Sequence, residues 1–206
     1  MSPNELKNLI QVWIRNSYLN ELSFDVTDEI LNHAIISFKE DYLRWHPSDE
    51  HILQKRVERN PQLIAILLYR ISHIMYVSRD NLEDRYRNED AYSLLSRHIG
   101  QMELFYSAEI GNGLKINHGI GLIIGARCKV GNNCLIHQGC TIGDRNGGRP
   151  VIGNNVTLYA GSMVLGDIQI GDNCIIGANS IVTRSFPENC VLVGSPAKCV
   201  KYVKDS

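Results

Sequence analysis

The sequence predicts an α+β protein, with an α-helical domain over residues 1–105 and a coil of short parallel strands over residues 106–206. Apolar residues recur every three or four positions in the first half, as on one face of a helix. From about residue 109 the composition shifts toward Gly, Ile, Val and Asn, and aliphatic residues recur at multiples of six. A chain of 206 residues has room for two such domains.

The helical half carries both apolar spacing and helix-start signals. The apolar positions are Leu6, Leu9, Ile10, Trp13, Ile14, Ile30, Leu31, Ala34, Ile35 and Phe38. Thr27, Ser48 and Asn88 each precede acidic residues, as N-cap residues do. The segment from Pro61 to His73 opens with proline at a suitable first position and is predicted to be the most buried helix.

The second half repeats with a period of six. The aliphatic positions are Ile124, Val130, Ile136 and Ile142 and, after a gap of ten, Ile152, Leu158, Val164, Ile170, Ile176 and Val182. This period fits a coil in which one aliphatic side chain per repeat enters a continuous core. The glycine or asparagine after each aliphatic suits tight corners with positive φ. A β-sandwich would instead show turns every 8 to 12 residues without a fixed period.

Charge and cysteine usage exclude several classes of function. The net charge of −1 argues against nucleic acid as the partner. The sequence lacks an apolar run long enough to span a bilayer and begins without the pattern of a signal peptide, so we expect a cytoplasmic protein with no membrane partner. The six cysteines form no Cys-x-x-Cys pair, which favours reduced thiols over a zinc site.

The six-residue repeat and the closing segment Val193–Lys198 resemble the hexapeptide-repeat acyltransferases. Within that class the segments Asn60–His73, Glu103–Gly113 and Asn117–Gly125 are similar to serine acetyltransferases. The resemblance implies a left-handed parallel β-helix for the second domain, acetyl-CoA as co-substrate, no metal, and assembly into a homotrimer or hexamer. It also implies transfer of an acetyl group to the hydroxyl of a small acceptor.

His118 occupies the position of the catalytic histidine in this resemblance. A neutral imidazole suits removal of an alcohol proton during attack on a thioester. His118 also lies where the six-residue register slips by two, between Ile116 and Ile124, so the coil is expected to bulge there. Glu103 stands where the family usually has a catalytic aspartate, and would orient the imidazole. An ordinary solvated glutamate remains an alternative for Glu103.

The resemblance places the acceptor near three further residues, and all three depart from the family pattern. Asn117 and His46 replace aspartates, and Arg149 in Gly148-Arg149-Pro150 replaces the histidine of an Arg-His-Pro triplet. Arg149 retains a guanidinium that can bind a carboxylate. His137 is a further acceptor-binding candidate, with an ordinary exterior position on the coil as its alternative.

The candidates for binding CoA are small residues and a lysine. Small side chains would let pantetheine lie against the coil, and a lysine binds phosphate as a point charge. The candidates are Ala160, Gly161, Gly177, Ala178, Ser195 and Lys198. The small residues among them have an alternative interpretation as tight corners that any such coil needs.

The leading hypothesis is therefore an acetyl-CoA-dependent O-acetyltransferase similar to serine acetyltransferase. The departures at the acceptor positions leave a sugar or another non-serine acceptor as an alternative, and an inactive scaffold as a further one. A hexapeptide carbonic anhydrase is disfavoured because it needs three well-placed histidines, and the coil contains only His118 and His137.

Overall fold

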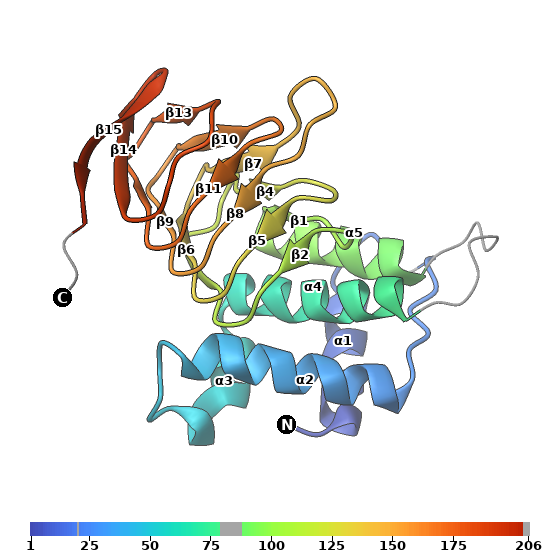
Figure 1. Ribbon diagram of the computed structural model, residues 1–206. Helices are drawn as coiled ribbons and strands as arrows, with labels where there is room; N and C mark the ends of the chain where they lie inside the picture. Colours follow the sequence, from blue (N-terminus) through green and yellow to red (C-terminus); the bar gives the residue numbers. More distant parts are fainter. Residues whose placement is uncertain (20, 79–87, 204–206) are drawn as a thin grey trace. The chain divides into compact units, whose positions relative to one another are not determined.

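The structure is a computed structural model that describes residues 1–19, 21–78 and 88–203. The chain divides into two compact units, Met1–Ser107 and Ala108–Ser206. The first contains the helices and the second the coil of strands (Figure 1). Within the described ranges, no helix is both long and apolar enough to cross a bilayer.

The first unit consists of five α-helices, a 3-10 helix and one short strand among its described residues. Their bounds are α1 (Pro3–Arg15), α2 (Asp28–Leu43), η1 (Glu50–Ile52), α3 (Leu53–Val57), α4 (Pro61–Val77), α5 (Asn88–Gly100) and β1 (Glu103–Leu104). Helix α4 packs against α2, α3 and α5, and its residues 64–72 are all buried. The prediction that this segment is the most buried helix is confirmed.

Of the three predicted N-caps, one is confirmed, one is wrong and one stands at the edge of the described residues. Thr27 caps α2 as predicted, because its side chain accepts a hydrogen bond from the Ile30 amide. Ser48 was the wrong residue: Asp49 holds the N-cap position of η1, and no side chain caps it. Helix α5 is described from Asn88 onward and the position before it lies outside the described residues, so the N-cap at Asn88 stays a prediction. Helix starts shift by a residue because several polar residues compete at each start.

The second unit is built from very short strands. They are β2 (Glu109–Ile110), β3 (Lys115–Asn117), β4 (Ile123–Ile124), β5 (Lys129–Val130), β6 (Leu135–His137), β7 (Thr141–Gly143), β8 (Val151–Ile152), β9 (Thr157–Leu158), β10 (Met163–Leu165), β11 (Gln169–Ile170), β12 (Ile175–Ile176), β13 (Ile181–Val182), β14 (Cys190–Gly194) and β15 (Ala197–Tyr202).

These strands stack into the three faces of a parallel β-helix. One face has the order β4-β7-β10-β13, the second β11-β8-β5-β2 and the third β14-β12-β9-β6-β3. Successive coils pair in register, for example Ile136 with Leu158 and Leu158 with Ile176. All ten aliphatics of the six-residue repeat are buried. The predicted fold class is therefore confirmed. The strands stack because each repeat contributes one aliphatic side chain to a shared core, which a single coil could not form alone.

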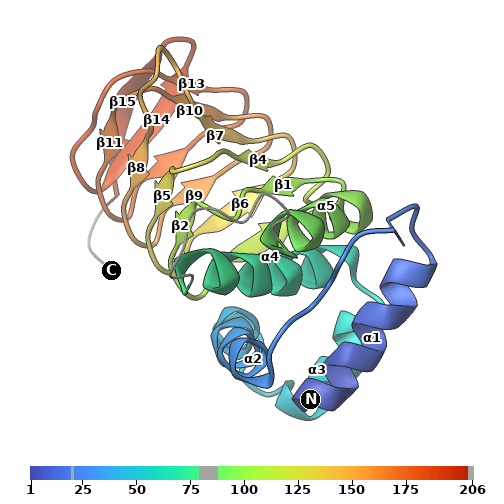
Figure 2. The ribbon, with the colours of Figure 1, turned by 90° about the vertical axis from the view of Figure 1, so that its right-hand side faces the viewer.

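The coil ends in the antiparallel pair β14 and β15, which closes the last turn (Figure 2). The register pairs Val193 with Lys198 and shifts at a bulge between Val191 and Leu192. Leu192 and Cys190 point into the core at the end of the stack and are fully buried. The hairpin thus covers apolar side chains that the last coil would otherwise expose to water.

The corners of the coil correct the expectation about glycine. Gly131, Gly153 and Gly171 follow core aliphatics but do not have positive φ. A Cβ at Gly153 would lie 2.3 Å from the Asp172 side chain, and a Cβ at Gly131 would lie 2.6 Å from the Gly153 backbone. Close stacking of corners therefore requires these glycines, and the left-handed conformation is taken by other residues.

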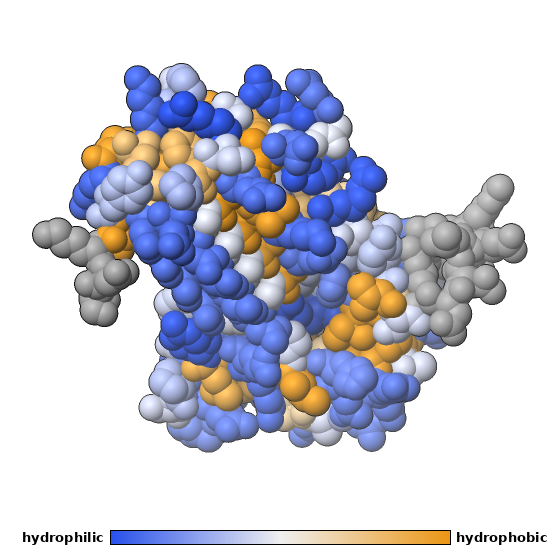
Figure 3. Space-filling model, in the orientation of Figure 1, coloured by the Kyte–Doolittle hydropathy of each residue, from blue (hydrophilic) through white to orange (hydrophobic). Residues whose placement is uncertain are grey.

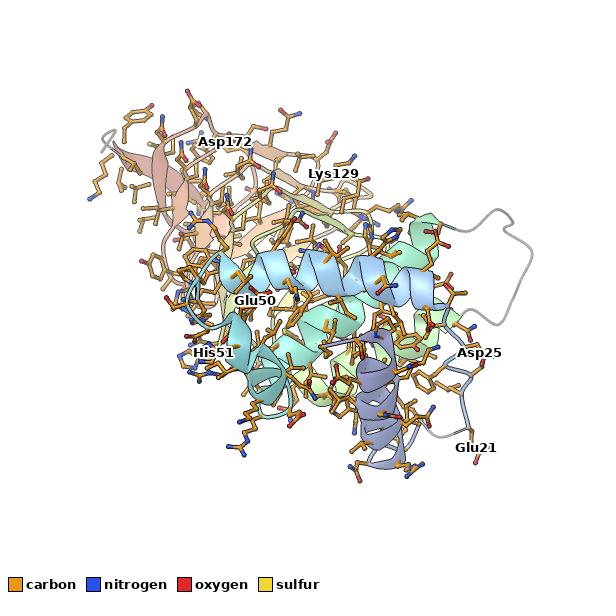
Figure 4. All side chains as sticks on the ribbon, turned by 90° about the horizontal axis from the view of Figure 1, so that it is seen from below. Glu21, Asp25, Glu50, His51, Lys129 and Asp172 are labelled. Carbon is orange, nitrogen blue, oxygen red and sulfur yellow. The ribbon has the colours of Figure 1, made fainter. Side chains whose placement is uncertain are left out.

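Asparagines make the left-handed turns and connect the coils. Asn133, Asn155, Asn173 and Asn189 have φ between 55° and 63°. Their side chains form a ladder, in which Asn155 donates to Asn173 and Asn173 donates to Asn189. Asparagine suits these turns because its short polar side chain tolerates positive φ and bonds locally. In a second ladder, Asp172 (Figure 4) accepts a hydrogen bond from the Asn154 amide at 2.7 Å.

Candidate active site

His118 lies in an irregular turn that directly follows β3. Its φ is 65°, in the left-handed region, and its side chain is exposed. The Ile120 amide donates to the His118 carbonyl at 2.6 Å, which closes the turn. Gly119 and Gly121 also have positive φ. Most of the other non-glycine residues in this conformation are asparagines, so a histidine there is unusual for this chain.

The strand register places His137 one coil beyond Asn117. β3 and β6 pair Asn117 with His137. The His137 ring in turn stacks on Tyr159, with the ring centroids 5.1 Å apart and the planes at 27°. Asn117, His137 and Tyr159 thus form a column on the outside of the coil, and its first member is adjacent to His118.

Burial lowers the pKa of His137 below its usual value of 6.5, and the nearby His118 and Lys115 lower it further. These three effects act in the same direction, because each disfavours a positive charge on the ring. The neutral form of the His137 ring is therefore favoured. A neutral imidazole offers one hydrogen-bond donor and one acceptor.

Arg149 belongs to the loop between β7 and β8, where the repeat has its insertion. Its Nε donates to the Ala126 carbonyl at 2.9 Å and its Nη1 to the Gly148 carbonyl at 3.2 Å. The guanidinium also forms an ion pair with Asp144. The side chain is largely buried, so these contacts hold the loop against the neighbouring coil. A carboxylate that bound Arg149 would compete with Asp144.

Glu103 and His46 belong to the helical unit. Glu103 is half-buried on β1, and its Oε1 lies 2.9 Å from Nη2 of Arg97. His46 is exposed after α2, with its ring 4.9 Å from that of Tyr42. Tyr42 donates a hydrogen bond to Asp49 at 3.3 Å. Each of the two candidates thus has a neighbour in its own unit that restricts its side chain.

The glycines among the CoA candidates have structural explanations of their own. Gly161 has a φ of 70°, and a Cβ there would lie 2.4 Å from Oδ1 of Asn179. A Cβ at Gly177 would lie 3.1 Å from Cγ2 of Val193. Ala160 accepts a hydrogen bond from the Asn179 amide at 2.9 Å. The Cβ contacts at Gly161 and Gly177 show that the coil itself favours glycine at these two positions.

The remaining CoA candidates lie on the surface near the end of the coil. Ala178 is exposed at the corner after β12. Ser195 is exposed in the turn between β14 and β15, and Lys198 is exposed on β15 opposite Val193. Within the parts of the chain that the structure describes, no three His, Cys, Asp or Glu side chains converge as metal ligands would.

Tyr159 is the residue of this column that sequence reasoning missed. It follows the core position Leu158, so the repeat already placed it on the exterior of β9. Counting one coil onward from His137, with the four inserted residues left out of the count, leads to Tyr159. The insertion hides this relation because it separates the two residues by 22 positions.

The chain is similar to known transferases. The family described as bacterial transferase hexapeptide (six repeats) matches residues 149–184. A serine acetyltransferase of Synechococcus elongatus is 40% identical over 144 residues, which cover 68% of this chain and 57% of the relative. One of Staphylococcus epidermidis is 40% identical over 143 residues, which cover 68% of this chain and 65% of the relative. The matches span less than two thirds of the length of either relative.

The fold is also similar to solved structures. The crystal structure of Neisseria gonorrhoeae serine acetyltransferase in complex with serine aligns with a TM-score of 0.71 and 27% sequence identity. The alignment covers 84% of this chain and 74% of that chain. The likeness therefore extends well beyond the hexapeptide repeats.

Proposed function

Because the chain belongs to the serine acetyltransferase-like members of the hexapeptide-repeat transferases, we propose that it transfers an acetyl group from acetyl-CoA to the hydroxyl of serine or a close amino alcohol. The observation that carries this proposal is His118, an exposed imidazole in a left-handed turn at the break in the coil register. Serine is the first acceptor to test, since a similar structure contains it.

The proposed step is a direct transfer with His118 as general base. The imidazole takes the hydroxyl proton while the hydroxyl oxygen forms a bond to the acetyl carbonyl carbon. The carbon–sulfur bond of the thioester then breaks, and the proton passes from His118 to the departing thiolate to give free CoA. Glu103 is the proposed partner that stabilises the imidazolium. The products are the acetyl ester and CoA, so the step needs no further reactant.

Asn117, His137, Arg149 and His46 are the proposed acceptor-binding residues. Asn117 and His137 lie next to each other beside the His118 turn, which supports a shared role. Arg149 already pairs with Asp144, so Asp144 competes with an acceptor carboxylate for its guanidinium. His46 supplies a ring in place of a carboxylate, so its role requires a hydrogen bond and not a charge pair.

The donor is proposed to lie along a column of small residues on the coil. Gly121, Gly139 and Gly161 stack in successive corners, and a Cβ at Gly139 would lie 3.8 Å from Gly161. Such a column leaves backbone accessible to the amide groups of pantetheine. Ala160, Gly177 and Ala178 extend this surface, while Ser195 and Lys198 are the candidates for the phosphate end.

We propose a homotrimer, or a hexamer made of two trimers, as the assembly. The coil exposes apolar side chains that a monomer would leave in water: Ile120, Ile123, Val151, Tyr159 and Val200 are 38% to 61% exposed. Figure 3 shows apolar patches among polar side chains on the viewed face of the molecule. Burying such patches between copies would stabilise the assembly. Light scattering that gives a monomer with full activity would contradict this proposal.

The decisive experiment follows free thiol while purified protein acts on acetyl-CoA and L-serine. His118→Asn is the informative variant, because asparagine tolerates the left-handed backbone at this position. General bases typically contribute 10² to 10⁴-fold, so turnover should fall by roughly that factor. The matched control is Asn133→His, which places an imidazole at another left-handed corner. Turnover by the His118→Asn variant close to that of the wild type would remove His118 from the mechanism.

The same assay tests the alternatives. A sugar acceptor would be indicated by turnover on nucleotide sugars in the absence of turnover on serine, and an inactive scaffold by no thiol release with any hydroxyl compound. Serine is preferred among them because serine acetyltransferases are the relatives of this chain. Acetate release without an acceptor would instead indicate a thioesterase.

A further inference from the structure

A second imidazole lies beside the proposed base. His137 is paired in register with Asn117, the residue before His118, and its ring is stacked on Tyr159. The ring is half-buried in this column. Within the described residues, no hydrogen bond engages either ring nitrogen of His137. The stack on Tyr159 is therefore the contact that fixes the orientation of this ring.

The titratable groups that act on the pKa of His137 are a lysine and a histidine, both of which are positive when charged. β3 contributes Lys115 on the same exterior face, and the turn after β3 contributes His118. The residue after β9 is the uncharged Tyr159, and the residue after the paired strand β12 is Gly177. Lys115 and His118 both lower the pKa of His137, after burial as the largest cause. Burial and these two groups all act against a charge on the His137 ring.

We propose that His137 is a positioning residue for proton transfer at His118. The stack on Tyr159 holds an uncharged imidazole beside the base, so His118 can take up the acceptor proton without a second positive charge next to it. Had the fold placed a lysine, an arginine or a readily protonated histidine at position 137, the imidazolium of His118 would form against repulsion. The inference rests on the proposed function, because it assigns His118 the base role.

The coupling between the two rings can be measured without any reaction. Proton NMR titration of the histidine ring protons in the full chain, without acetyl-CoA or acceptor, gives the midpoint of His137. We expect that midpoint below 6.5. His118→Asn removes one of the charges that lower it, so the midpoint should rise by about 0.5 pH unit. An unchanged midpoint would overturn the inference.

Tyr159 supplies the matched pair of variants. Tyr159→Ala removes the stack and exposes His137, so its midpoint should rise by about 0.5 pH unit or more. Tyr159→Phe keeps an aromatic ring in the same place, so the midpoint should stay at the wild-type value. Both substitutions are on the exterior of the coil and leave its core unchanged, so the two variants differ only in whether an aromatic ring is present. Equal midpoints for both would show that the stack does not control His137, and would overturn its part in the inference.

The pH profile of thiol release gives the functional readout. His137→Lys places a permanent positive charge beside His118, so the acid limb of kcat/KM should move to lower pH by about 0.5 to 1 unit, with a lower plateau. His137→Gln, which is neutral at every pH, should keep the acid limb at the wild-type position whatever its effect on rate. An acid limb that stays at the wild-type position in His137→Lys would show that a charge at position 137 does not act on His118, and would overturn the inference.

Failure of this inference can be told apart from failure of the proposed function. If the protein releases no thiol with any hydroxyl acceptor, the proposed function fails, and the kinetic arm fails with it. The NMR arm is then read alone: a midpoint that moves in His118→Asn and Tyr159→Ala still supports the coupled pair. If thiol release depends on His118 but His137 titrates independently, the proposed function stands and the positioning role is wrong.

Discussion

Arg70 and Asp41 form a bidentate ion pair inside the helical unit, in which Nε and Nη2 of Arg70 each lie 2.8 Å from a carboxylate oxygen of Asp41. The side chains are only 4% and 2% exposed. A buried pair of this kind links α2 to α4 and satisfies both charged groups. If only one of the two charged side chains is removed, the other charge loses this partner in an apolar environment.

We therefore expect Asp41→Asn to lower the free energy of unfolding by about 3 to 5 kcal/mol, because the Arg70 charge stays buried. The double variant Asp41→Leu with Arg70→Met should be much less destabilised, since apolar replacement of a buried pair is often neutral. Urea unfolding of the wild type and both variants measures the difference. A double variant that is less stable than Asp41→Asn would show that the pair itself is a net stabilising contribution.

Asn173 provides the second prediction. It has a φ of 57° and lies in the ladder between Asn155 and Asn189. Asn173→Ala should destabilise the coil by about 2 kcal/mol, since alanine disfavours positive φ and loses the ladder bonds. Asn173→Gly should cost about 1 kcal/mol because glycine loses the bonds only. Thermal unfolding ranks the two variants, and equal losses would mean that backbone conformation contributes nothing at this corner.

The third prediction concerns the thiols. Cys128, Cys134, Cys140, Cys174 and Cys190 are buried, whereas Cys199 is partly exposed. Burial raises the pKa of Cys134 to about 11 and that of Cys190 to about 12. The thiolate is the reactive form, so a raised pKa reduces reactivity at pH 8. Brief labelling of the native protein with iodoacetamide should modify Cys199 first, as seen by peptide mass spectrometry. Faster labelling of Cys134 would contradict the buried core.

The fold was predictable because the period of six is a property of the core itself. Every aliphatic in the repeat, such as Ile136 or Leu158, must enter the stack for any coil to close, so the pattern and the structure report the same constraint. The corners were less predictable. Glycine appears there both for positive φ, as at Gly161, and for space, as at Gly153, and the two causes look alike in sequence.

The candidate site was predictable only residue by residue. The slip in register identified the turn at His118, and the structure shows its left-handed backbone. The stack of His137 on Tyr159 depends on which residues share an exterior position in successive coils, and the loop insertion interrupts that count. The pairing of Arg149 with Asp144 depends on the path of the loop, which the spacing of the repeat does not fix.

The fourth prediction separates two roles for Glu103. Its ion pair with Arg97 is partly exposed, and such pairs contribute only about 0 to 1 kcal/mol to stability. If Glu103 orients His118, Glu103→Gln should lower kcat and leave the Michaelis constant for acetyl-CoA unchanged, while Arg97→Met should have a smaller effect. If the ion pair with Arg97 is its sole role, the two variants should show the same small change. Steady-state thiol release for both variants decides between these roles.

The last prediction concerns how the loop recognises a carboxylate. Arg149 is paired with Asp144, so an acceptor that carries a carboxylate competes with an internal one. Asp144→Asn removes that competitor and leaves Arg149 bound to the Ala126 and Gly148 carbonyls. We expect the Michaelis constant for L-serine to fall by about threefold to tenfold, equivalent to roughly 1 kcal/mol. Ethanolamine, which has the amine and the hydroxyl but no carboxylate, should show no such gain. Arg149→Lys should weaken serine but not ethanolamine, since lysine lacks the planar fork that binds carboxylates. If the Michaelis constants for both acceptors change alike in both variants, Arg149 only stabilises the loop, and the acceptor is recognised elsewhere in the site.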